Sequence, residues 1–267
     1  MKFKTPYMSL YLLKIYVLGA LSTIGNIVLA QKNIIISDSL TANSEKLNVK
    51  MGTQSFGKIW RFRFGEYKVV SSKLGWTTTS AKSNLLNTKT ESKSTEKFSF
   101  ILTNKTNDSA NVNASNNIDI KVLKDLEIIS GVFWGNKESW EENRNFSAFI
   151  AINQDTSETW TLLMNTVAGG NTQDKYSVVL TNGERKIFVI AATSNKNGDD
   201  SRSFPAQGYE FVENGLSLCA VQYYGGGALG MNKNIVWILN SLNEKMKLVL
   251  AAAATALLQI KVTSMTS

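Results

Sequence analysis

The chain has 267 residues, of which 43% are hydrophobic, and its formal net charge is +8. It contains no histidine and a single cysteine, Cys219, which excludes histidine-based catalysis, imidazole zinc sites and an intramolecular disulfide. Outside residues 1–30, 26 basic and 21 acidic residues remain and are spread along the chain, so we expect no nucleic-acid partner.

Residues 1–30 have the pattern of a cleavable secretory signal peptide. Lys2, Lys4 and Lys14 precede the apolar run Ile15–Ala30, and the small residues Val28 and Ala30 precede a cleavage junction at Gln31. The alternative is an uncleaved membrane anchor, for which the strongly apolar stretch is short. We expect an exported protein that is periplasmic, on the outer surface or secreted, with no transmembrane helix after cleavage.

The following residues, 31–267, read as one β-rich domain. Lys58–Val70 alternates with period two, which places Trp60, Phe62 and Phe64 on one face of a half-buried strand that bends at Gly65.

The next segment, Ser71–Asn117, is rich in Ser, Thr, Asn and Lys. It predicts one strand, Phe98–Thr103, among long loops. Ile118–Ile129 fits either a strand or a helix, and Gly131–Trp134 looks like a strand.

Three turn signals then favour an antiparallel meander over parallel βαβ units. Residues 154–158 read as a hairpin loop between Phe146–Asn153 and Thr159–Asn165. Asn182-Gly183 and Asn214-Gly215 are strong signals for a type I′ hairpin turn, because both residues tolerate a positive φ.

The C-terminal part predicts a helix from about Leu242 to Ile260. The segment is rich in Ala and Leu, and Ser241-x-x-Glu244 has the spacing of a capping box. Its apolar core, Leu248–Leu258, is too short to span a bilayer, so we expect it to pack on the sheet. The predicted fold is mainly β, an antiparallel sandwich or partial barrel with a C-terminal Ala-rich helix. Asn234–Leu239, before this helix, is a strand or the start of a helical pair.

Two short motifs carry no cofactor or metal prediction. Gly225–Gly230 matches G-x-G-x-x-G, but it lacks the strand–helix–strand context of a dinucleotide site, so we interpret it as a flexible turn. Asn195–Asp200 is polar and acidic but does not follow the order of a calcium loop. We interpret Cys219 as a buried core residue.

Aromatic and acidic side chains supply the candidate sites. Trp60 and Trp160 look like core residues, whereas rings in polar surroundings could stack on sugars. The candidate binding residues are Trp76, Trp140, Tyr223 and Tyr224. A glycosidase needs two carboxylates and no histidine, and its candidates by type are Glu66, Glu141, Glu142, Glu158 and Glu210. The sequence does not bring any two of them together, so no catalytic residue is predicted.

The Val-Leu-Ala/Gln junction, the Ser/Thr/Asn/Lys-rich strands and the phrase LSLCAVQYYGGGALGMNKNIVWI at 216–238 resemble uncharacterised exported proteins of Bacteroidota-type bacteria. The resemblance implies export and brings no catalytic residues.

These observations lead to one function hypothesis and two alternatives. The first is a non-catalytic cell-envelope or secreted module that binds a glycan or an envelope protein. The alternatives are a carboxylate-dependent glycan hydrolase, which two buried acids in one cleft would favour, and a subunit of an envelope assembly. An exposed apolar face on the C-terminal helix would favour the assembly.

Overall fold

The structure, a computed structural model, describes residues 33–52, 58–83, 89–123, 126–129, 132–134, 139–169, 172–195, 205–227 and 232–266. The expected leader and its cleavage junction lie outside these residues. The described elements are α2 (Asp38–Asn43), β1 (Ser44–Asn48), β2 (Lys50–Met51), β3 (Phe62–Phe64), β4 (Tyr67–Leu74), β5 (Thr78–Ser83), β6 (Lys89–Thr103), β7 (Ser109–Leu123), β8 (Leu126–Ile129), β9 (Val132–Trp134), β10 (Ser139–Ile152), β11 (Asp155–Gly169), β12 (Thr172–Thr181), β13 (Lys186–Thr193), β14 (Gln207–Glu213), β15 (Leu216–Tyr224), β16 (Ile235–Leu239) and α3 (Glu244–Thr266).

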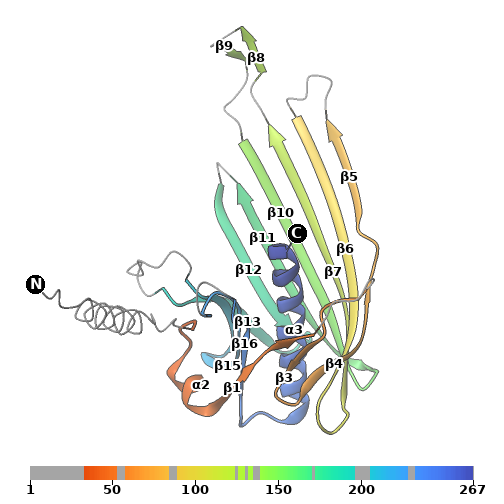
Figure 1. Ribbon diagram of the computed structural model, residues 1–267, viewed down its shortest axis with the longest axis vertical. Helices are drawn as coiled ribbons and strands as arrows, with labels where there is room; N and C mark the ends of the chain where they lie inside the picture. Colours follow the sequence, from red (N-terminus) through yellow and green to blue (C-terminus); the bar gives the residue numbers. More distant parts are fainter. Residues whose placement is uncertain are drawn as a thin grey trace, which may run out of the picture.

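Fourteen strands form one antiparallel sheet that curls around α3, whereas β8 and β9 form a separate two-stranded sheet (Figure 1). From β10 to β16 each strand pairs with the next strand along the chain. This order confirms the predicted meander. It also confirms a mainly β fold with a C-terminal helix, in the partial-barrel form.

The segment 44–51 joins the two ends of the sheet. Its first part, β1, pairs with β16, and its last part, β2, pairs with β3. Between them, the Val49 amide donates a hydrogen bond to the Asn234 carbonyl at 2.9 Å. One extended segment therefore closes the lower part of the sheet into a barrel-like wall, which satisfies backbone groups at both edges.

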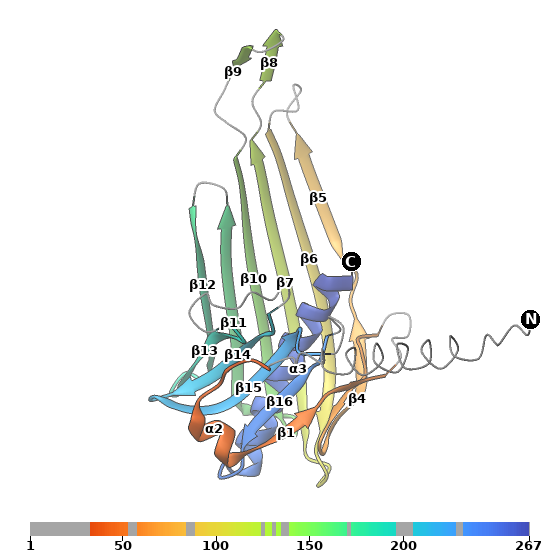
Figure 2. The ribbon, with the colours of Figure 1, turned by 60° about the vertical axis from the view of Figure 1, so that its left-hand side comes forward.

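Helix α3 fills the interior of this wall (Figure 2). Every side chain from Leu248 to Leu258 is buried, and the helix packs against β7, β10, β15 and β16. The run Ala251–Ala254 adds little bulk, so the surrounding strands can approach the helix closely. Among the described residues, no helix is long and apolar enough to cross a membrane.

The helix begins two residues later than predicted and extends further. Asn243 is its cap, because the Asn243 side-chain oxygen accepts a hydrogen bond from the Met246 amide at 2.8 Å. The capping box predicted from Ser241 is therefore wrong. The predicted end at Ile260 is also too early, since the helix continues to Thr266.

Several side chains lie where the alternation predicted. Phe62, Phe64 and Trp160 are fully buried, whereas Trp60 is only half-buried against the core. Cys219 is buried and unpaired, and burial raises the pKa of its thiol. Gly65, at φ +51, is in the turn between β3 and β4.

Two predicted loop regions are wrong. The stretch 71–117 contains most of β4 to β7 rather than long loops. The turn between β10 and β11 comprises only Asn153 and Gln154, both at positive φ, instead of residues 154–158. The described part of Ile118–Ile129 is strand, and so is β16.

Of the two Asn-Gly signals, only one has the expected backbone. Asn214 and Gly215 both have positive φ, as a type I′ turn requires. At Asn182-Gly183 only the glycine does, and the Asn182 side chain accepts the Glu184 and Arg185 amides instead.

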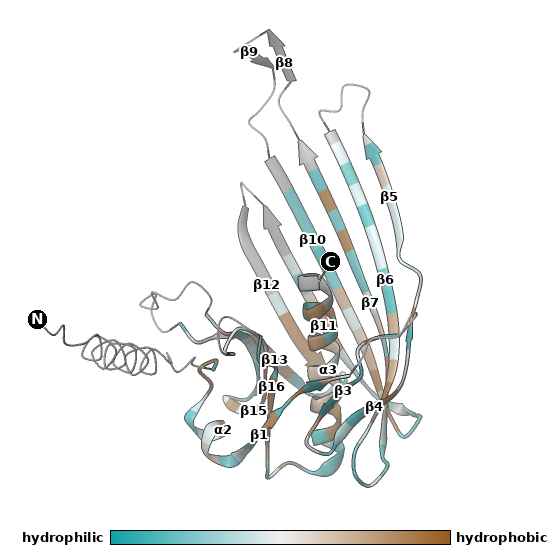
Figure 3. Ribbon diagram, viewed as in Figure 1, coloured by the Kyte–Doolittle hydropathy of each residue, from teal (hydrophilic) through white to brown (hydrophobic). Residues whose placement is uncertain are grey.

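The long strands extend beyond the helix, and in Figure 3 the outer parts of β5 and β6 are mostly hydrophilic or neutral, whereas the lower half of the sheet contains more hydrophobic residues. We call 78–83, 89–96, 117–123, 139–145, 165–169 and 172–177 the projecting sheet, and the remaining sheet with α3 the helix-filled base. The projecting sheet has open edges, because among the described residues β5 pairs only with β6, and β12 pairs with β13 only from Val179 to Thr181.

Candidate functional site

The outer face of the sheet is formed by the strand positions that alternate with the buried ones. On β7, Val112 and Ala114 point toward α3 and are buried, so Asn113 and Ser115 face outward. The register places these outward residues in rows across the strands. One row runs through Lys97, Ser115, Ser147, Leu163 and Val179, and the next through Lys73, Ser99, Asn113 and Phe149.

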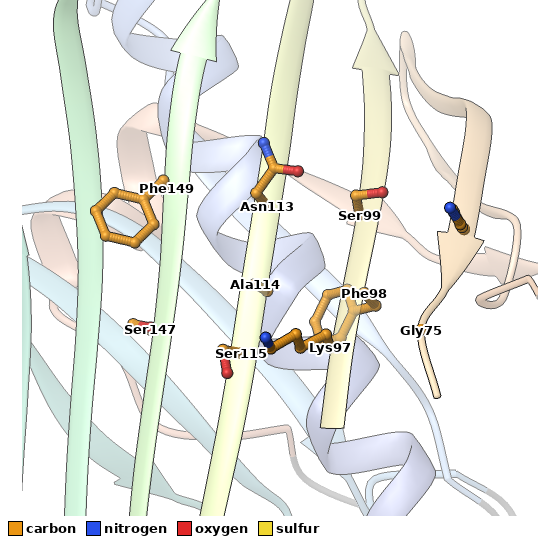
Figure 4. Close-up of a pocket in the computed structure, with 10 residues that line it drawn as sticks. Gly75, Lys97, Phe98, Ser99, Asn113, Ala114, Ser115, Ser147 and Phe149 are labelled. Atoms are coloured by element: carbon orange, nitrogen blue, oxygen red, sulfur yellow. The ribbon is translucent and has the colours of Figure 1, made fainter. Parts of the chain in front are cut away.

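These rows line a groove on the outer face at the boundary between the base and the projecting sheet, and Figure 4 shows the part over β4 to β10. Its first hollow, over β4 to β10, has a volume of about 340 Å³. A second hollow of about 380 Å³ shares Ser147 with the first and continues over β11 and β12. We call the two hollows together the outer groove.

Gly75 forms one wall of the groove because it allows the chain to lie close to β6. Its amide donates a 2.7 Å hydrogen bond to the Lys97 carbonyl. A Cβ atom added at Gly75 would lie 3.0 Å from that oxygen, so a side chain would push the two segments apart.

One exposed aromatic residue lines the first hollow, and a second is next in the chain to a residue that lines it. The Phe149 side chain projects from its rim and is 54% exposed, although its neighbours Ala148 and Ile150 are fully buried. Trp76 directly follows Gly75 and is 92% exposed. Large exposed rings beside a hollow are typical of a binding surface.

Charge is distributed unevenly along the groove. Lys73 and Lys97 are both exposed at the β4–β6 end, and no Asp or Glu is among the described lining residues. Neither lysine has an acidic partner within the described chain. Elsewhere on the sheet, Lys93 pairs with Asp119 at 3.2 Å.

Side-chain amides border the groove on its upper side. The Thr95 hydroxyl donates to the Asn117 side-chain oxygen at 2.9 Å, and the Asn165 amide donates to the Asn145 oxygen at 2.6 Å. These bonds hold the side chains in place and leave other donors and acceptors facing solvent. The groove therefore combines aromatic, amide, hydroxyl and ammonium groups.

The structure places only one predicted binding residue next to this groove. Trp76 directly follows the lining residue Gly75 without lining the groove itself, whereas Tyr223 and Tyr224 are on β15, outside the strands that line it. The side chain of Trp140 lies outside the described residues. The three described residues, Trp76, Tyr223 and Tyr224, therefore do not form one site.

Tyr223 packs against Tyr209 and Lys261 rather than lining the groove. Its ring centroid is 5.3 Å from that of Tyr209, and its hydroxyl donates to the Gln207 side-chain oxygen at 3.2 Å. The Lys261 ammonium lies 5.3 Å from the Tyr223 ring centroid, and burial lowers the pKa of Lys261. These contacts attach the helix to β15.

Sequence reasoning missed Phe149, Lys73 and Lys97. The signal for Phe149 was present, because it is out of phase with Phe146, Ala148 and Ile150 in an alternating strand. The lysines had no comparable signal, since their placement depends on strand pairing far along the chain.

The carboxylates predicted by type are dispersed. Three form ion pairs, Glu66 with Lys105, Glu142 with Arg144 and Glu158 with Lys245. The fourth, Glu210, is buried and accepts hydrogen bonds from the Ser37 amide at 2.8 Å and the Ser217 hydroxyl at 2.5 Å. Glu141 is exposed on β10.

One cleft at the lower end of the base does contain several carboxylates. It has a volume of about 210 Å³ and is lined by Glu45, Glu66 and Glu244. Glu45 and Glu244 are exposed, and Glu244 pairs with Lys247 at 2.9 Å. This is not the pair of buried acids that would favour a hydrolase. Among the described residues, no three His, Cys, Asp or Glu side chains are arranged so that they could hold a metal ion.

The glycine motif is part of an antiparallel hairpin. Gly225 and Gly226 have positive φ, and the Gly225 amide donates to the Asn232 side-chain oxygen at 3.0 Å. The motif connects β15 to its antiparallel partner β16, so it lacks the strand-to-helix context of a dinucleotide site. Residues 196–200 of the polar acidic loop lie outside the described chain.

No protein-family model matches the chain, and neither a curated protein nor a solved structure shows significant similarity to it.

Proposed function

We propose that the protein is an exported, non-catalytic binding module that holds an extended glycan chain in the outer groove. The signal-peptide pattern of residues 1–30 supports export. The observation that carries the binding proposal is the exposed ring of Phe149 in a hollow of about 340 Å³ lined by serine and asparagine.

The chemistry of this hollow matches a sugar ring. A pyranose has apolar C–H faces and a rim of hydroxyl groups, so it is bound by a flat apolar surface beside short polar side chains. Phe149 supplies the apolar surface. Ser99 and Asn113 supply hydroxyl and amide groups that both donate and accept hydrogen bonds.

The extent of the groove favours a chain over a single sugar. The two hollows extend over β4, β6, β7, β10, β11 and β12. Five steps between these six strands, at about 4.8 Å each, give a length of about 24 Å. A linear polymer can contact this whole length, whereas a monosaccharide would fill only part of one hollow.

The groove has binding groups without catalytic ones. Glycoside hydrolysis requires two carboxyl groups on either side of the scissile bond, and the described lining of the groove contains none. The chain also has no histidine that could act as a general base.

The test is a glycan-array screen on the purified protein in its exported form, with reducing-sugar release measured for every hit. Phe149→Ser and Trp76→Ala should each weaken binding about tenfold, as expected for the loss of one stacking ring. Leu216→Ser is the matched control, because Leu216 is an exposed apolar residue on β15, outside the groove.

Two outcomes would overturn the proposal. Binding that Phe149→Ser leaves unchanged would place the site elsewhere. Sugar release that Glu66→Gln or Glu244→Gln abolishes would identify the lower cleft as the active site of a hydrolase.

A further inference from the structure

We propose that the glycan held in the outer groove is acidic, and that Lys73 and Lys97 bind its carboxylate or sulfate groups. This inference rests on the proposed function and specifies the ligand class of the same site. It also predicts where along the groove the charged groups of the ligand lie.

The register places the two lysines next to each other on the outer face. Lys73 is paired with Ser99 on β6, and Lys97 is two residues from Ser99 on the same face. In an antiparallel pair this diagonal relation brings two residues to about 7–8 Å, within reach of long side chains. Both side chains line the first hollow, at its end near Trp76.

Lys73 and Lys97 bring two positive charges to the same end of the first hollow. Some exposed lysines in the described chain have acidic partners, such as Lys93 with Asp119 and Lys105 with Glu66, both at 3.2 Å, whereas others outside the groove, such as Lys50 and Lys233, do not. At Lys73 and Lys97 the described residues supply no such partner. An anionic group of the ligand that reaches these ammonium groups would form charge-assisted hydrogen bonds with them.

The rest of the groove is uncharged, so the positive charge lies at one end of the site only. The lining of the second hollow is formed by amide, hydroxyl and apolar side chains, among them Asn145, Leu163 and Ser177. Charge recognition is therefore confined to the β4–β6 end. Neutral parts of the polymer fit the remaining length over β10 to β12.

The experiment compares polymers that share a backbone and differ in charge. Polygalacturonate is compared with its fully methyl-esterified form to test carboxylates, and dextran sulfate with dextran to test sulfates. We expect at least one polyanion to bind about tenfold more tightly than its neutral partner, with affinity that falls as salt is added. The double variant Lys73→Gln/Lys97→Gln should abolish this preference.

The matched control is Lys50→Gln/Lys233→Gln, which removes the same charge from exposed positions outside the groove. An equal loss of binding in this control would show attraction to overall charge and overturn the inference. Equal affinity for the charged and neutral polymers would also overturn the inference. If Phe149→Ser weakened the binding of both polymers, the proposed glycan binding would still be supported. Absence of binding to every polymer and to the array would instead overturn the proposed function.

Discussion

Strand β7 passes from the helix-filled base into the projecting sheet, and its inward side chains differ between the two regions. In the base, Ala110, Val112 and Ala114 are buried against the interior. Further along the same face, Ile118 and Ile120 are only half-buried, although the strand pairing continues unbroken to Leu123. Backbone pairing therefore extends beyond the part of the sheet that has a core.

The length of α3 explains where the core ends. A helix of 23 residues is about 35 Å long, whereas a 15-residue strand such as β7 spans about 50 Å. The long strands therefore extend past the end of the helix. Past that end, no other described element covers the inner face of the strands. We expect the stability of the molecule to reside in the base and the tolerance to substitution in the projecting sheet.

The largest expected effect is in the base. Trp160 is 1% exposed and packs in the main core, with the Arg185 guanidinium 5.4 Å from its ring centroid. Trp160→Ala should lower the free energy of unfolding by about 3–5 kcal/mol, because it leaves a large cavity. Urea-induced unfolding, followed by far-ultraviolet circular dichroism, measures this change.

Trp76→Ala is the matched control for this prediction, because it removes the same side chain from a fully exposed position. It should change the free energy of unfolding by less than about 0.5 kcal/mol. Similar losses from the two variants would contradict the assignment of stability to the base.

A smaller effect is expected at an ion pair on the rim of the base. Arg185 forms two hydrogen bonds with the Glu213 carboxylate, at 2.8 and 2.7 Å, and these bonds hold the pKa of Glu213 below its usual value. The stabilisation is therefore present above the unfolded pKa of about 4.3 and is lost as the pH falls through the folded pKa.

Glu213→Gln should lower the free energy of unfolding by about 0.5–1 kcal/mol at pH 7. The difference from the parent protein should shrink as the pH falls below about 4, which urea unfolding at pH 7 and pH 3 would detect. In the projecting sheet, Asp119→Asn removes a single 3.2 Å contact to Lys93 and should have almost no effect at either pH. A constant difference for Glu213→Gln would show that its charge does not act through Arg185.

The fold of the base can be predicted from the sequence better than that of the projecting sheet, because only the base has a buried core. Period-two alternation is a signal of one buried face, and it correctly predicted burial for Phe62, Phe64 and Trp160. The outer parts of the strands in 71–117, residues 78–83 and 90–96, lack it because they bury little on either face. They are held by long-range pairing, such as Lys89–Ser94 with Ile118–Leu123, which no local pattern shows.

The candidate site was even less predictable. Trp76 was correctly predicted to be exposed, since a tryptophan between polar residues has no strand face to share with a core. The groove, however, depends on the register of β4, β6, β7 and β10, which brings Lys73 and Phe149 into one row. Such a row becomes visible only when the strand pairing is known.

The smallest expected effect concerns the projecting sheet itself. The Asn165 side-chain amide donates to the side-chain oxygens of Asn145 and Asn143, at 2.6 and 3.4 Å, on the solvent-facing side of β10 and β11. In Asn165→Ala, water replaces the lost hydrogen bonds, so the free energy of unfolding should fall by no more than about 0.5 kcal/mol. The same variant should weaken glycan binding, because Asn165 lines the second hollow.

Urea unfolding and glycan titration on the same preparation separate the two effects. A loss of stability above about 1 kcal/mol would mean that the projecting sheet unfolds together with the base and shares its stability. Reduced binding with unchanged stability would instead show that the polar end of the sheet is retained for its ligand, while the helix-filled end maintains the fold.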